Sequence, residues 1–132
     1  MNLKHLAFSF CLLLACENLL LAEDKTQKNP FITELNVPLD YANATAKDVE
    51  DYVNYTISEV TSGITSIHNQ QTVTFESVFA ALEGINSKIS VAYSNCHMLY
   101  WVSPDSLIRA KGLEGFQLLD SVSTMIYSDR DI

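Results

Sequence analysis

The side chains that most often carry out chemistry are few in this chain and stand apart from one another. The histidines are His5, His68 and His97, and Cys96 directly precedes the last of them. Adjacent residues on a helix point about 100 degrees apart, so Cys96 and His97 cannot bind the same ion. Zinc sites on helices use ligands three or four residues apart, and no pair of these residues has that spacing. The sequence therefore predicts no metal site.

Nucleophilic and acid–base catalysis are equally poorly supported. The chain has no Gly-x-Ser-x-Gly motif and no glycine-rich phosphate loop, and Cys96 falls within an apolar helical stripe, where a thiol is a poor nucleophile. Glu50–Asp51 and Asp129–Asp131 are short charged clusters that we expect on solvated surfaces. Paired carboxylates carry out acid–base catalysis only in a cleft, so these clusters predict no such role. We therefore predict no catalytic residue and no cofactor-binding residue in this chain.

Composition narrows the choice of partners. The chain has 132 residues, with 8 Lys plus Arg against 16 Asp plus Glu and a net charge of -8. This length indicates a single domain. The acidic balance argues against a nucleic-acid partner, because binding phosphates requires a basic face.

Residues 1–23 have the pattern of a secretory signal peptide. Lys4 precedes a ten-residue apolar run, Leu6–Ala15, that is too short to span a bilayer. Cleavage is expected between Cys16 and Glu23. Alternatively, Leu13–Cys16 acts as a bacterial lipobox, and Cys16 then carries a lipid anchor. Both alternatives predict a secreted or cell-envelope protein.

Removal of the leader leaves Cys96 as the last cysteine, so we expect no internal disulfide and a buried thiol. Two sequons begin at Asn43 and Asn54. They are potential glycan acceptors in a eukaryotic secreted protein and carry no meaning in a bacterial one.

Periodicity predicts an all-α fold of antiparallel hairpins, with an extended leader over 24–44 and three long helices over 45–132. The first helix is expected to begin at Thr45, with Asp48 completing a capping box, and to end at 68–71. One of its faces is apolar. The members of this face are Val49, Tyr52, Val53, Ile57, Val60, Ile64 and Ile67.

The second helix is expected to begin after Thr74, and the third after Ser103 with Pro104 in its first position. Gly112 and Gly115 in the third helix either allow close approach of another helix or are weak points. The buried stripes are Val78, Leu82, Ile85, Ile89, Ala92, Cys96 and Leu99 in the second helix, and Ile108, Gly115, Leu119, Val122 and Ile126 in the third.

Aromatic residues widen the apolar surface of the second helix. Phe75, Phe79, Tyr93 and Tyr100 lie beside its stripe, which predicts a second neighbour. Trp101 is expected to plug the turn between two helices, with the lining of a ligand groove as the alternative.

Two segments carry a family resemblance: Thr74-Phe75-Glu76 with Ala81-Leu82, and Val102-Ser103-Pro104 followed by Ile108-Arg109-Ala110. In order and spacing, the chain over about 30–132 resembles the N-terminal region of the thimet oligopeptidase and neurolysin family of zinc metallopeptidases. The resemblance implies an almost wholly helical enzyme that cuts short peptides in a deep channel, using zinc held by a His-Glu-x-x-His motif. The N-terminal helices of that family form part of the channel wall.

The first hypothesis is therefore a channel-wall segment of a zinc oligopeptidase, which is non-catalytic on its own. The resemblance implies that its partners are the remainder of the peptidase and, for the complete enzyme, short peptide substrates. The resemblance implies zinc for the complete enzymes of the family, and we predict no cofactor in this chain.

The family continues for several hundred residues beyond the position of Ile132, so we expect a fragment or a stand-alone paralogue. The best-known members are cytosolic or mitochondrial, so the leader suggests an exported relative. The alternative is a small exported helical binding module or lipoprotein.

Overall fold

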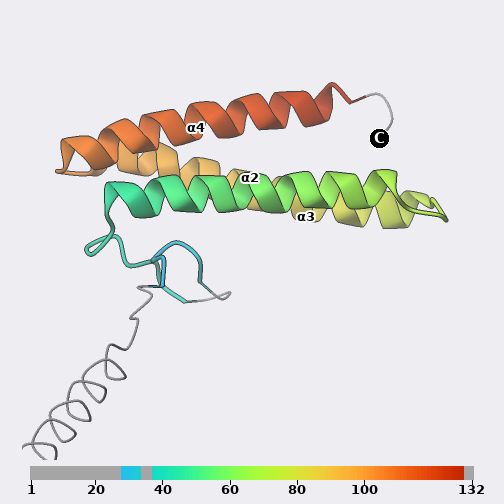
Figure 1. Ribbon diagram of the computed structural model, residues 1–132, viewed down its shortest axis with the longest axis horizontal. Coiled ribbons are helices and arrows are strands. Elements are labelled where there is room, and N and C mark those ends of the chain that lie inside the picture. Colours follow the sequence, from blue (N-terminus) through green and yellow to red (C-terminus); the bar gives the residue numbers. More distant parts are fainter. Residues whose placement is uncertain (1–27, 34–36, 130–132) are drawn as a thin grey trace, which may run out of the picture.

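The computed structural model describes residues 28–33 and 37–129, and it contains three long helices (Figure 1). They are α2 (Ala46–His68), α3 (Phe75–Val102) and α4 (Ser106–Tyr127). The described residues contain no strand, so the predicted all-α fold is confirmed. The predicted signal peptide over 1–23, with Cys16, lies outside the described residues.

Contacts between side chains define how the helices run. Lys88 on α3 pairs with Glu59 on α2 at 2.8 Å, and Asn95, about two turns further along α3, bonds back to Tyr52 near the start of α2. The two helices are therefore antiparallel. Lys111 on α4 pairs with Glu50 near the start of α2, so α4 runs parallel to α2, and each helix contacts the other two.

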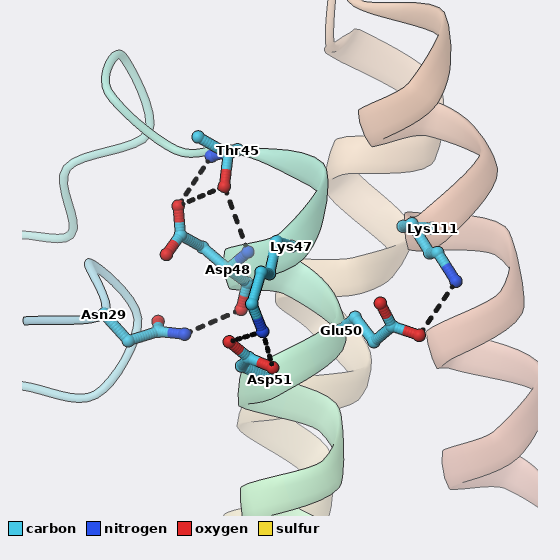
Figure 2. A network of polar contacts seen from close by, with 7 residues as sticks. All are labelled: Asn29, Thr45, Lys47, Asp48, Glu50, Asp51 and Lys111. Carbon is cyan, nitrogen blue, oxygen red and sulfur yellow. Dashed lines mark hydrogen bonds and ion pairs between the residues drawn. The ribbon is translucent and has the colours of Figure 1, made fainter. Parts of the chain in front are cut away.

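The first two helices begin where the sequence predicts. Thr45 caps α2: its hydroxyl accepts from the amide of Asp48, and the Asp48 carboxylate accepts from the amide of Thr45 (Figure 2). Thr74 and Ser77 form the same reciprocal pair at the start of α3. Each cap satisfies amides that the helix leaves without partners, which is worth about 1 kcal/mol.

The predicted start of the third helix is wrong by two residues. The amide of Ser103 still bonds to the carbonyl of Leu99 at 3.1 Å, so Ser103 ends α3 instead of starting α4. Asp105 is the N-cap of α4, and its carboxylate accepts from the amides of Leu107 (2.7 Å) and Ile108 (3.3 Å). A charged acceptor suits the positive end of a helix better than a hydroxyl does.

The apolar stripes of the three helices meet in two core clusters. One cluster is formed by Phe31, Val49, Tyr52, Val53, Ala92, Cys96, Leu99, Ile108 and Leu119. The other is formed by Val60, Ile67, Ile85 and Ile89. Gly115 is also buried, and the remaining members of the predicted stripes are half-buried and pack against these clusters, so the predicted core faces are confirmed.

Gly112 and Gly115 lie where α3 and α4 approach most closely. A Cβ at Gly112 would stand 2.7 Å from the carbonyl oxygen of Cys96 and 2.8 Å from the amide nitrogen of Tyr100. A Cβ at Gly115 would stand 2.7 Å from a methyl group of Val53 and 3.0 Å from the Cys96 sulfur. Of the two interpretations left open by the sequence, close approach of a neighbouring helix is the one that holds.

The segment before α2 is non-helical in its described parts, as its prolines predict, yet it contributes to the core. Phe31 is 4% exposed and stacks on Tyr52 at a ring distance of 5.4 Å. The Asn29 side-chain amide donates to the carbonyl of Asp48 at 2.7 Å (Figure 2). These two contacts hold the segment against the first turns of α2.

Candidate functional site

Cys96 lies between the helices, with none of its surface exposed. Its burial raises the pKa of the thiol to about 11, from an ordinary value of 9.0. A thiol in this setting packs as a small hydrophobic group and is neither a nucleophile nor a metal ligand at neutral pH. The predicted burial of Cys96 is confirmed.

We expect this thiol to resist modification while the chain is folded. Because the pKa in the folded state is about two units above the ordinary value, the thiolate fraction at pH 8 falls by about 100-fold. In a variant with Cys11 and Cys16 replaced by serine, a disulfide reagent such as DTNB should react with Cys96 at least about 100-fold more slowly than in 6 M guanidinium. Equal rates in the two solvents would show that the thiol is accessible.

The raised pKa of the Cys96 thiol also determines how the stability of the folded chain changes with pH. Between about pH 9 and 11 the unfolded chain releases the thiol proton and the folded chain keeps it. The contribution of Cys96 to stability is therefore fully present below pH 9 and is lost as the pH rises through this window.

His97 and Trp101 form an exposed pair on the outer side of α3. The Trp101 indole donates to His97 Nε2 at 3.0 Å, and the His97 ring lies 5.5 Å from the ring of Phe116 on α4. Trp101 is 67% exposed, so the prediction that it plugs the turn is wrong. Leu99, two residues earlier, faces the core and Trp101 points away from it.

The predicted second neighbour of α3 is α4 along part of its length. Tyr93 and Tyr100 are half-buried, with ring distances to Phe116 of 5.5 and 6.4 Å. Phe75 and Phe79 stack on each other at 5.4 Å and both stay exposed. The aromatic surface of α3 is therefore covered by α4 only over the half that follows Ile89.

Of the carboxylates singled out in the sequence, Glu50 and Asp51 belong to surface ion pairs, Asp129 bonds to a histidine, and Asp131 lies outside the described residues. Lys111 bridges Glu50 on α2 and Glu114 on its own helix, at 3.1 and 2.9 Å, and these bonds raise the pKa of Lys111. His68, at the end of α2 as expected, bonds to Asp129 at 3.0 Å. Over 28–33 and 37–129, no group of three His, Cys, Asp or Glu side chains is arranged to hold a metal ion.

Both sequons are accessible. Asn43 and Asn54 are exposed, and the amide of Asn43 donates to Asp40 at 2.7 Å.

A groove of about 560 Å³ lies between the segment before α2 and the helices α2 and α3. Its walls are mostly apolar, and the ion pair of Lys88 with Glu59 borders it. The Asn95 side chain bonds both to Tyr41 and to Tyr52, and burial raises the pKa of both tyrosines, which therefore stay protonated at neutral pH. This volume falls in the range of small-molecule sites.

Sequence reasoning missed this groove. Its floor is formed by the helices, which the periodicity predicts, but its wall is formed by Phe31, Ile32 and Leu39 of the leader. The available signal was the apolar pair that follows Pro30, in a stretch otherwise interpreted as an extended leader.

None of the helices in the described part of the chain is long and apolar enough to cross a bilayer. No family model, no curated protein and no solved structure matches this chain.

Proposed function

We propose that this chain is the N-terminal helical segment of a secreted or cell-envelope zinc oligopeptidase that hydrolyses short peptides. In this proposal the three helices form part of the wall of the substrate channel and supply no catalytic group. The remainder of the peptidase is the partner of this segment, and short peptides are the substrates of the complete enzyme.

The main support is the apolar surface that the described residues leave exposed. Nine large apolar side chains among them are more than half exposed, and exposed apolar side chains indicate a contact surface where they adjoin, as the stacked rings of Phe75 and Phe79 do. They are Val73, Phe75, Phe79, Val91, Trp101, Val102, Leu107, Met125 and Tyr127. A segment that packs against the body of a larger helical enzyme would bury these side chains.

Most of the residues that carry the family resemblance fall at the ends of α3 and the start of α4, and Ala81-Leu82 lies within α3. Thr74 caps α3, and Ser103 with Pro104 forms the turn into α4, where Arg109 donates to both of their carbonyls at 2.8 and 2.9 Å. The resemblance thus follows a helical hairpin. The zinc of the proposed enzyme would belong to the remainder of the chain, because the described residues do not fit it, and no residue here is assigned to it.

A small exported binding module is the second candidate, and the groove favours it. Its volume and apolar walls suit a compact ligand. On this hypothesis the groove is the functional site, and the exposed apolar side chains named above contact a separate partner. A lipoprotein version adds an acyl group to Cys16.

The deciding experiment follows the reading frame beyond Ile132 and tests its product. We expect a downstream His-Glu-x-x-His motif, one zinc per molecule of the complete product, and chelator-sensitive cleavage of a short quenched peptide. The 132-residue chain alone should cleave nothing and bind no stoichiometric zinc.

Circular dichroism of the 132-residue chain separates the two candidates. A wall segment without the rest of its enzyme should unfold at a lower temperature than it does within the complete product, and it should aggregate through its exposed apolar side chains. A stop codon after Ile132, together with a sharp cooperative melt of a stable monomer, would overturn the proposal in favour of the binding module.

A further inference from the structure

The outer face of α3 and α4 combines aromatic side chains with carboxylates. On α3 the residues at helical spacing are Phe75, Phe79, Glu83, Tyr93, His97 and Trp101. On α4 they are Phe116, Asp120 and Tyr127. The two rows adjoin, because Phe116 lies within 5.5 Å of the rings of both Tyr93 and His97. We call this surface the aromatic face.

The carboxylates of this face differ from the other surface carboxylates of the chain. Glu76, Glu83 and Asp120 are exposed, and their side chains form no hydrogen bond or ion pair with the rest of the described chain. Glu76 and Glu83 are seven residues apart and Asp120 follows Phe116 by one turn, so all three border the aromatic row.

The other carboxylates over 28–33 and 37–129 have partners within the chain. Asp51, Glu59 and Glu114 pair with Lys47, Lys88 and Lys111, respectively. Asp48 and Asp105 cap helices. Lys47 lies on α2. Lys88 and Lys111 lie on the sides of α3 and α4 that meet α2, away from the aromatic face. Arg109, the cation nearest to that face on α4, is already bonded to two carbonyls of the α3–α4 turn.

An apolar face with unbalanced negative charge is complementary to an apolar surface that carries positive charge. Ammonium and guanidinium groups also bind favourably over the faces of aromatic rings, and opposite charges at the rim set the orientation of a partner. A neutral apolar partner would leave all three carboxylates without compensation at its edge.

We propose that the aromatic face binds a helical protein surface on which lysine or arginine side chains flank leucine-like apolar residues. This inference rests on the proposed function, because it assigns that surface to the remainder of the peptidase. It adds which face of the segment is buried in the complete enzyme and what chemistry faces it.

The test uses the full 132-residue chain and a helical peptide of about 18 leucine and lysine residues, long enough to be helical when bound. Trp101 is the single tryptophan of the chain and lies on the aromatic face, so the peptide needs no label. We expect a blue shift of the tryptophan emission, weakened by 0.5 M salt. A matched leucine–glutamate peptide should cause no shift.

Two triple variants with equal changes in net charge localise the binding. Replacing Glu76, Glu83 and Asp120 by their amides should raise the dissociation constant of the leucine–lysine peptide by about tenfold in total. A single lost charge contact accounts for at most about fivefold. The control D51N/E59Q/E114Q should change it by less than about twofold, because those carboxylates are already paired. Helical content by circular dichroism checks that both variants are folded.

Equal weakening in the two triple variants, or an equal response to the leucine–glutamate peptide, would overturn this assignment. Such a result would leave the proposed function standing if the complete product contains zinc and cleaves peptides. Conversely, charge-selective binding with no zinc motif downstream would retain the aromatic face and reject the peptidase.

Discussion

Replacing Gly112 by alanine is expected to lower the free energy of unfolding by roughly 1 to 3 kcal/mol, in spite of the higher helix propensity of alanine. The new methyl group would stand 2.7 and 2.8 Å from backbone atoms of Cys96 and Tyr100. Backbone atoms of a helix cannot move aside as the end of a flexible side chain does, so α3 and α4 would have to separate. Urea denaturation followed by circular dichroism measures the change.

Gly84 provides the matched control. It also lies inside a helix, but nothing stands within 4 Å of the position of its Cβ. Gly84→Ala should therefore stabilise the chain by up to about 1 kcal/mol, through propensity alone. If the two alanine variants had the same stability, the close approach of α3 and α4 at Gly112 would be refuted.

Replacing Phe31 by alanine should cost about 3 to 5 kcal/mol, the usual penalty for removing a buried aromatic side chain. The ring is 4% exposed, stacks on Tyr52 and meets Tyr41 edge-on at 5.7 Å. Its loss would open a cavity above α2 and release the segment that forms one wall of the groove. Thermal unfolding gives the stability, and near-ultraviolet circular dichroism reports on the tyrosines.

Val37→Ala is the control for Phe31, because Val37 belongs to the same segment but is 49% exposed. Its effect should stay within about 0.5 kcal/mol, as for most surface changes. A Phe31 variant as stable as the Val37 variant would mean that the segment before α2 does not pack on the helices.

The helices could be predicted from the sequence because capping residues and apolar spacing act over a few neighbouring positions. Thr45 and Thr74 each have a partner three residues ahead, and the capping bonds form within that distance. The stripe from Ile85 to Leu99 is likewise set by helical spacing. The start of α4 was missed because Ser103, Pro104 and Asp105 all suit a helix start, and the length of α3 decides among them.

Features that depend on distant packing were not predictable in the same way. Phe31 is followed by an apolar neighbour and a polar one, a pattern too short to indicate burial, and its environment is formed by Tyr52, 21 positions later. The exposure of Trp101 depends on which side of α3 receives α4. The groove requires the packing of Phe31 on α2 together with the pairing of α2 and α3, so no single stretch of sequence predicts it.

The two glycines of α4 have a consequence for the alignment of the bundle. The surface of α4 is recessed at Gly112 and Gly115. The backbone of α3 at Cys96 and Tyr100 fills the recess at Gly112, and the side chains of Val53 and Cys96 fill it at Gly115. Sliding α4 by one turn in either direction would bring the side chain of Ile108, Phe116 or Leu119 to a place that admits only a hydrogen atom. Apolar stripes alone would allow α4 to pack on α3 in several registers, whereas the recess at the two glycines permits one.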